Sequence, residues 1–208
     1  MRLVKGSLMI LLIMFFCGMA NAQLAFGIQG GIGGSSFDKN LSIPGIDKLG
    51  IDKGANSIPV GVFVASNILP LFDVGIEYNM LVVPFKFENN NVVPGAKLSV
   101  TFTQSLLGAF VKWYVLPLPL IEPYVKAGAG YYSGKIKVDL TGSVTVPGLA
   151  STDFKNTMGF NIGAGVKTMV GLYGEFVYHI ISRKPDITDA KQAAYNNWML
   201  MVGYQFEL

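Results

Sequence analysis

The sequence predicts an all-β fold, an eight-stranded antiparallel up-and-down β-barrel that crosses a membrane with its strands. Three observations predict it: eight segments alternate apolar and polar side chains, their connections alternate long and short, and a secretory leader precedes them. Successive side chains of a strand point to opposite faces, so this alternation gives a ribbon with one apolar side. No later stretch is long and apolar enough for a membrane helix, and closed barrels are the other fold that satisfies the backbone in lipid.

The leader has the layout of a secretory signal peptide. Arg2 and Lys5 precede an apolar run over residues 8–19, and Ala20-Asn21-Ala22 supplies a small-residue cleavage site. The apolar run is shorter than the roughly 18 residues that a membrane helix needs, which disfavours an uncleaved anchor. We therefore expect cleavage after residue 22 and a single barrel domain over residues 23–208.

The charge balance changes once the leader is set aside. The whole chain has 16 Lys and Arg against 13 Asp and Glu, and two of the basic residues lie in the leader, which leaves 14 against 13. A net charge near zero indicates no nucleic-acid partner. The one cysteine, Cys17, also lies in the leader, so the expected domain has no disulfide.

The alternating segments run through the whole domain. The last is the clearest, because apolar and aromatic residues take every even position while Met199, Gly203 and Gln205 lie on the other face. The predicted strands are 24–34, 58–67, 71–83, 99–115, 122–134, 156–168, 171–183 and 198–208.

The connections between these strands predict the orientation of the barrel. Membrane barrels have tight turns on the periplasmic side and longer loops outside. The short connections are 68–70, 116–121 and the turn at 170–171, and the long ones are 35–57, 84–98, 135–155 and 184–197. We expect both termini on the periplasmic side and four outer loops that meet the environment.

The face opposite the apolar band supplies the candidate functional residues. An eight-stranded barrel is only wide enough for side chains to fill it, and enclosed charges need partners. We expect a hydrated plug in which Lys112, Lys126 and Lys167 balance Glu77, Glu122 and Glu175, with a narrow water path as the alternative. The candidate interior polar residues are Gln29, Glu77, Gln104, Lys112, Glu122, Lys126, Asn161, Lys167, Glu175, His179 and Gln205.

Two predictions follow from this assignment of faces. An arginine in place of Val74 or Ile162 should impair membrane assembly, because a charge on the lipid face costs roughly 2–4 kcal/mol. The inward substitution Asn161→Asp should be far milder. Aromatic residues near strand ends, including Tyr114, Tyr132, Phe154 and Tyr173, are expected to form the girdles that mark the water–lipid boundary.

The sequence gives little support for a catalytic, nucleotide-binding or metal-binding site. The glycine cluster at 27–34 lacks the spacing of a nucleotide-binding loop, and no helix follows it. The only histidine, His179, lies three residues from Ser182, so the two face oppositely on a strand, and Ser105 or Ser133 could approach it only through tertiary structure. With no second histidine and no cysteine, a metal site is not expected. No catalytic, cofactor-binding or metal-binding residue is assigned.

The C-terminal segment carries a resemblance. Residues 201–208 resemble the closing-strand signal of bacterial outer-membrane barrels, which the assembly machinery reads, with Gly203, Phe206 and Leu208 at its glycine and alternating apolar places. An aromatic residue is commoner where Leu208 stands. With the leader and the eight segments, the chain resembles the small outer-membrane β-barrel proteins, the OmpA-like or porin-family barrels. That resemblance implies the outer membrane of a Gram-negative bacterium, with its lipid and the barrel-assembly machinery as partners.

Fold and composition leave several functions open. The leading expectation is a monomeric, non-enzymatic barrel with a structural or surface-interaction role through its outer loops. The alternatives are a narrow porin-like channel for ions or small solutes, a lipid-modifying enzyme that uses His179, and a soluble periplasmic barrel that encloses an apolar ligand. In the soluble alternative the apolar faces would point inward, and alternation by itself does not decide which face is wet.

Overall fold

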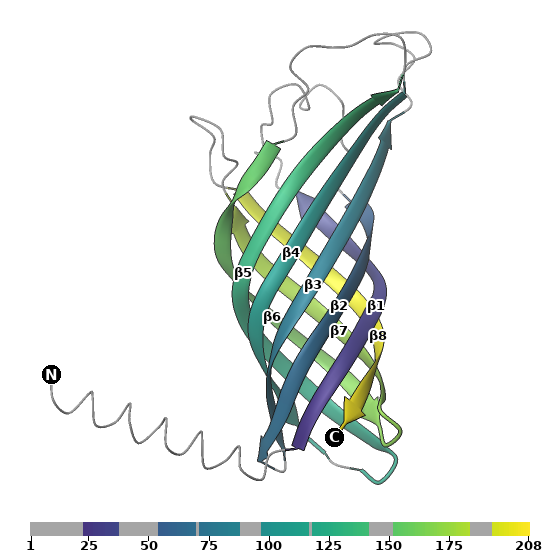
Figure 1. The fold of residues 1–208 in the computed structure, drawn as a ribbon, viewed down its shortest axis with the longest axis vertical. Helices are drawn as coiled ribbons and strands as arrows, with labels where there is room; N and C mark the ends of the chain where they lie inside the picture. Colours follow the sequence, from purple (N-terminus) through teal and green to yellow (C-terminus); the bar gives the residue numbers. More distant parts are fainter. Residues whose placement is uncertain are drawn as a thin grey trace, which may run out of the picture.

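The protein is described by a computed structural model, and the described residues are 23–37, 54–69, 71–87, 97–116, 118–141, 152–183 and 193–208. The predicted fold class is confirmed, because eight antiparallel strands form one closed barrel (Figure 1). Its strands are β1 (Gln23–Phe37), β2 (Gly54–Leu69), β3 (Phe72–Phe87), β4 (Lys97–Tyr114), β5 (Ile121–Thr141), β6 (Thr152–Thr168), β7 (Leu172–Arg183) and β8 (Ala193–Glu207).

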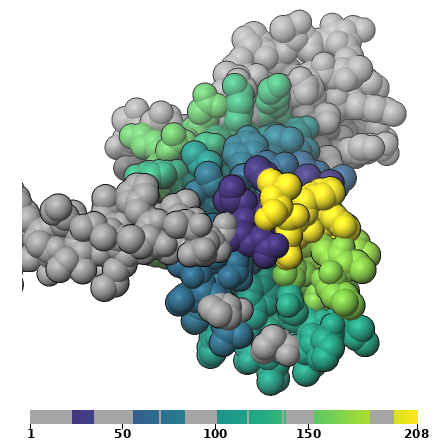
Figure 2. All heavy atoms as spheres, turned by 60° about the horizontal axis from the view of Figure 1, so that its bottom comes forward, coloured from purple at the N-terminus to yellow at the C-terminus, as the bar shows by residue number. Residues whose placement is uncertain are grey.

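Each strand pairs with its neighbours in the chain, and β1 pairs with β8 to close the wall. In this closing pair Gly30 lies opposite Val202, and the two strands lie side by side at the surface in Figure 2. Short turns join β2 to β3, β4 to β5 and β6 to β7 at one end of the barrel, which we call the short-turn end. We call the other end, where the remaining connections begin, the long-connection end.

The strands run further than the sequence pattern predicts. β5 continues seven residues beyond the predicted end at 134, β6 begins at Thr152 and not at 156, and β8 begins at Ala193 and not at 198. The predicted loops 35–57, 84–98, 135–155 and 184–197 are therefore wrong at their edges. Backbone pairing continues there although the apolar alternation has stopped. The remaining connections, 38–53, 88–96, 142–151 and 184–192, lie outside the described residues, as does the predicted leader.

Most of the wall has its apolar side chains outside. Ile76, Ile162 and Val202 are 59–67% exposed, whereas Glu77 and Asn161 are 2–3% exposed. These faces are the ones that alternation predicts. A molecule with this distribution is covered by an apolar medium on its outside, because soluble monomers rarely expose so large an apolar surface.

The polarity of the two faces inverts along β4, β5 and β6. In the part nearer the short-turn end, which we call the lower band (107–113, 124–131 and 158–166), apolar side chains face outward. In the part nearer the long-connection end, the upper band (101–106, 133–137 and 153–156), hydroxyl and charged groups face outward instead. On β4 the change falls between Leu106, which is 1% exposed and points inward, and Leu107, which is 60% exposed. The strands therefore extend beyond the apolar belt.

Glycines of the wall make room for large rings inside it. Four glycines each lie directly opposite an inward-facing ring on the neighbouring strand, and a Cβ atom added at the glycine would collide with that ring. Aromatic side chains in this way fill the space inside the eight-stranded wall. The pairs are Gly27 with Phe63, Gly75 with Phe110, Gly165 with Tyr124, and Gly203 with Tyr173.

Candidate functional site

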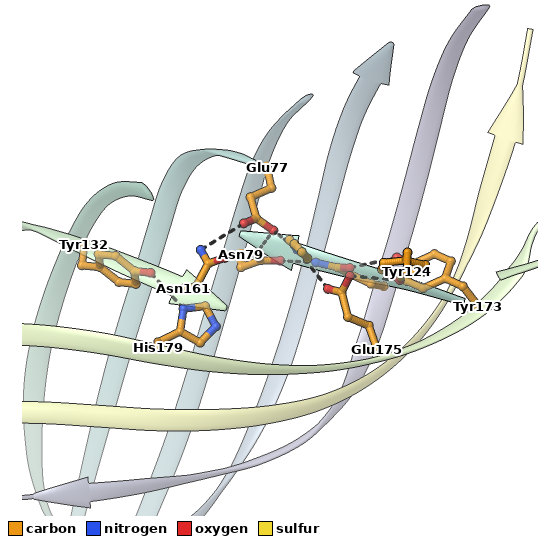
Figure 3. Close-up of polar contacts among 10 residues, drawn as sticks. Glu77, Asn79, Tyr124, Tyr132, Asn161, Tyr173, Glu175 and His179 are labelled. Carbon is orange, nitrogen blue, oxygen red and sulfur yellow. Dashed lines mark hydrogen bonds and ion pairs between the residues drawn. The ribbon is translucent and has the colours of Figure 1, made fainter. Parts of the chain in front are cut away.

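The centre of the interior is a buried ion triad (Figure 3). The ammonium of Lys126 on β5 lies 2.9 Å from a carboxylate oxygen of Glu77 on β3 and 2.9 Å from one of Glu175 on β7. All three side chains are 3% exposed or less. A buried charge is tolerated only when its geometry is good and its remaining hydrogen-bonding atoms are satisfied, so neighbouring polar groups must complete the triad.

Uncharged side chains donate further hydrogen bonds to the two carboxylates of the triad. Tyr124 donates its hydroxyl hydrogen to Glu175 at 3.0 Å, and Asn79 donates its amide to Glu77 at 2.8 Å. Asn161 donates a longer hydrogen bond to the other oxygen of Glu77, at 3.4 Å. From these contacts we expect Asn161→Asp to be more damaging than the sequence predicts, because the new carboxylate would face Glu77 where a donor is needed.

A second chain of hydrogen bonds ties the triad to β1, one of the two strands that close the wall. Tyr173 donates to the side-chain oxygen of Gln29 at 2.8 Å, and Gln29 donates to Asn79. Because Asn79 also donates to Glu77, the contacts run without a break from β7 through β1 to β3 (Figure 3). The network therefore crosses the lumen and joins strands that are not adjacent in the wall. In this way the interior side chains stabilise the barrel.

Lys112 has a different environment from the one that the sequence predicts. Its ammonium lies 4.5–5.5 Å from the ring centroids of Phe63, Phe110, Tyr124 and Tyr173. Among the described residues, no carboxylate lies within 4.0 Å of it. The predicted balance with a glutamate is wrong for this lysine. Cation–π attraction and the longer-range field of the nearby carboxylates hold the charge instead.

The short-turn end of the lumen has its own polar groups. Lys167 lies 2.9 Å from Glu122 and 2.7 Å from Glu207, and all three are partly exposed. Gln205 is buried and donates to Glu207 at 3.3 Å. Lys167 therefore pairs with one of the glutamates predicted to balance the lysines, in a more hydrated setting than the central triad. A further buried carboxylate, Asp73, accepts hydrogen bonds from Tyr114 at 2.6 Å and from Asn67 at 3.2 Å.

The long-connection end of the lumen is largely apolar. His179 lies 2.9 Å from the hydroxyl of Tyr132, and Asn197 donates to Gln104 at 3.4 Å. Around these groups lies what we call the apolar layer, in which every side chain is 0–1% exposed. Gln104 and His179 are inward as predicted, but this end of the lumen is more apolar than the polar interior that the sequence predicts. The apolar layer consists of Leu81, Val83, Phe102, Leu106 and Ile181.

The described residues do not assemble a catalytic or metal site. His179 is 1% exposed and points inward, whereas Ser182 lies on the outer face, as do Ser105 and Ser133. No group of three or more potential metal ligands occurs in the described ranges. Nor do those ranges contain a helix that could cross a membrane.

Several interior residues escaped the sequence reasoning. Tyr114, Tyr132, Phe154 and Tyr173 are at most 7% exposed and fill the lumen, so their assignment to a boundary girdle is wrong. Counting positions from the nearest inward residue places Tyr114, Tyr132 and Tyr173 correctly, because these three have inward parity. Phe154 has the parity of the outward residues Met158 and Phe160, and it points inward because a β-bulge between Phe154 and Thr157 reverses the alternation. Asn197 was missed because it lies in the segment that was predicted as a loop.

A closed wall of eight strands with an apolar outer belt and an ion-paired interior defines a membrane-spanning β-barrel. Comparison with protein families agrees, because the family described as "Outer membrane protein beta-barrel domain" matches residues 8–206, and the chain belongs to this family. It is a protein of the Gram-negative outer membrane, and in barrels of this kind the longer loops face outward and the short turns face the periplasm. A comparison with curated proteins found no match.

Solved structures share the fold. Neisserial surface protein A (NspA) is 12% identical with a TM-score of 0.52, and the match covers 88% of this chain and 99% of that one. OprG from Pseudomonas aeruginosa is 16% identical with a TM-score of 0.55, covering 88% and 95%. The protease OmpT from Escherichia coli is also similar, at 10% identity and a TM-score of 0.44, covering 90% and 97%. These identities are low enough that the likeness concerns the fold alone.

Proposed function

We propose that this protein is a monomeric, non-enzymatic barrel whose sealed interior serves as a rigid scaffold and whose four long connections act outside the cell. The observation that carries the proposal is the apolar layer at the outer end of the lumen. Phe102 and Leu106 of β4 lie there with Leu81 and Val83 of β3, all 0–1% exposed. Below it, the triad of Lys126 pairs the central charges with one another and leaves them unavailable to a passing ion.

The separation of the only histidine from the candidate nucleophilic serines supports the proposal that the protein is not an enzyme. A general base must reach the hydroxyl that it activates. His179 contacts Tyr132, whose hydroxyl lies in the same buried layer, and the serines considered as nucleophiles lie on the other side of the wall. A lipid substrate outside the barrel has no route to this imidazole through the described wall.

Recording conductance in planar bilayers tests the sealed interior. We expect the wild-type protein to show no discrete conductance steps, and the double variant Phe102→Ala, Leu106→Ala to show them, because it removes the largest side chains of the apolar layer. The matched control is Phe160→Ala, Leu107→Ala, which removes similar side chains from the outer face. Steps in the wild-type protein would overturn the sealed scaffold, whether or not the variants conduct.

Accessibility in intact cells tests the outward role of the connections. A peptide tag inserted within 142–151 should bind antibody on intact cells, whereas the same tag at the turn near Gly171 should bind only after permeabilisation. The reverse pattern would overturn the orientation. Shortening the connection 142–151 should then leave the heat-modifiable gel mobility of the folded barrel unchanged while it removes any binding of the cells to a surface.

A narrow channel is the second candidate, because several buried polar atoms have no hydrogen-bond partner among the described residues. Such atoms are ordinarily satisfied by water, and a continuous file of water would be a path for protons or small ions. The conductance recording separates the two functions. These atoms include ones of Gln205 near the short-turn end, Asn161 in the middle, and Gln104, His179 and Asn197 in the upper part.

A further inference from the structure

A hollow of about 350 Å³ lies on the outer wall of the upper band. It faces outward, because Ser105, Ser133 and Lys135 of its lining have outward parity on β4 and β5. Six of its eight lining residues have polar side chains, with hydroxyls, an amide and charges of both signs. The lining residues are Thr103, Ser105, Ser133, Gly134, Lys135, Asp153, Phe154 and Asn156.

A β-bulge shapes this hollow. Tyr132 pairs with Thr157 and Gly134 with Phe154, so two residues of β6, 155 and 156, lie opposite the single residue Ser133. A bulge bends its strand and redirects side chains, and bulges are frequent next to binding sites. Here it brings Asn156 to the hollow and an exposed lysine, Lys155, beside it.

The hollow lies at the edge of the apolar belt. Immediately below it on the same three strands, Leu107, Tyr131 and Met158 are 56–62% exposed on the outer face. Lipid chains cover such side chains in a membrane barrel, and the lipid headgroups lie at the border of the belt. Because this border is on the side of the long connections, the headgroups that reach the hollow belong to the outer leaflet.

Positive charge gathers at this border. Lys135 lines the hollow, and the exposed Lys137 and Lys155 lie on β5 and β6 close in sequence to its lining residues. Among the side chains described there, Asp153 is the one exposed carboxylate. The pair formed by Lys135 and Asp153 spans 3.7 Å with both side chains well exposed, so it holds Lys135 only weakly. Among the side chains that the structure describes, the charged groups exposed on the outer wall in this half of the barrel are these four alone.

We propose that this hollow binds the phosphorylated headgroup of an outer-leaflet lipid. The three lysines supply the charge that attracts a phosphate at the membrane surface. The hydroxyls of Thr103, Ser105 and Ser133 and the amide of Asn156 donate hydrogen bonds to its oxygens. The acyl chains of the same lipid lie on the exposed apolar side chains below. The inference depends on the orientation of the barrel and not on whether its lumen conducts.

Native mass spectrometry of the full chain, folded in a neutral detergent, tests this proposal. The probes are diphosphorylated lipid A, the same lipid without its phosphates, and inorganic phosphate. We expect the phosphorylated lipid to bind at least about tenfold more tightly than the dephosphorylated one, since each basic residue near a membrane surface contributes about fivefold. Inorganic phosphate at equal concentration should not compete. Equal binding of the two lipids, or full competition by phosphate, overturns the proposal.

Variants assign the binding to the hollow. The triple substitution Lys135→Gln, Lys137→Gln, Lys155→Gln should weaken lipid binding about tenfold or more, whereas arginine at the same three positions should retain it. Asp153→Asn should strengthen binding about twofold because it releases Lys135. Heat-modifiable gel mobility establishes that each variant is folded. Unchanged binding by the folded glutamine variant overturns the site.

Discussion

The upper and lower bands of β4–β6 are built from the same alternating strands with opposite polarity. In the lower band, Ile162 faces outward and the ammonium of Lys126 lies inside, paired to the carboxylate of Glu77 on β3. In the upper band, the hydroxyl of Thr103 lies on the outside and the ring of Phe102 inside. The difference shows that alternation specifies two faces and that the surroundings decide which face is polar. Lipid surrounds the lower band and water the upper one.

The two interiors are consequently stabilised by different forces. The upper band buries apolar side chains as a soluble protein does, and its contribution grows with the buried area. The lower band encloses charges that need compensation, because lipid outside and a narrow lumen inside give them no bulk water. Lys126 has ion pairs for this purpose and Lys112 has aromatic rings. Substitutions can therefore test the two bands separately.

Removing the central cation should give the largest effect. Lys126→Met leaves Glu77 and Glu175 buried without their shared partner, so we expect the free energy of unfolding to fall by about 3–5 kcal/mol. Urea unfolding of the protein in lipid vesicles measures it. The matched control is Lys167→Met, whose partners are partly exposed, with an expected loss of about 1 kcal/mol or less. Equal losses would mean that the two interior ion clusters are hydrated alike.

An arginine introduced on the outer face should give the next largest effect, and it should destabilise the lower band much more than the upper band. Ile162→Arg places a charge on the lipid-facing side of the lower band and should cost about 2–4 kcal/mol, measured by the same unfolding experiment and by the yield of folded barrel. Thr101→Arg makes the same addition on the outer face of the upper band and should change stability by less than about 0.5 kcal/mol. A large loss at Thr101 would contradict the inversion of polarity, since it would place that residue in lipid.

The smallest effect concerns the hydrogen bond within the upper interior. Tyr132→Phe removes the hydroxyl that lies 2.9 Å from the ring nitrogen of His179, so we expect a loss of about 1–2 kcal/mol. The neighbouring residue Tyr131 is 62% exposed on the outer face and gives the control. Tyr131→Phe should stay within about 0.5 kcal/mol of the wild-type protein. If both variants behaved alike, the imidazole would have another partner in solution.

The strand number, the pairing order and the two faces could be predicted because period-two alternation is a property of the extended backbone. The ends of the strands could not be predicted, because the alternation of apolar and polar residues weakens where the polarity of the two faces inverts, as at Ser133 and Lys135 of β5. The inward position of Glu77 and Lys126 followed from parity. The partners of Lys112 did not, because its rings come from β2, β5 and β7, and only the closure of the barrel brings Phe63, Tyr124 and Tyr173 together.

The four pairs of a glycine and a ring have a consequence for how the strands find their alignment. In a hairpin with a tight turn, the turn itself sets the register. The pairs formed by Gly27, Gly75, Gly165 and Gly203 lie between β1 and β2, β3 and β4, β5 and β6, and β7 and β8, the strands joined by the long connections. A slip of two residues would take each ring away from its glycine. These contacts therefore favour the correct register during assembly in the strand pairs whose connection is too long to set it. The long connections can then vary in length and sequence without changing the register of the strands.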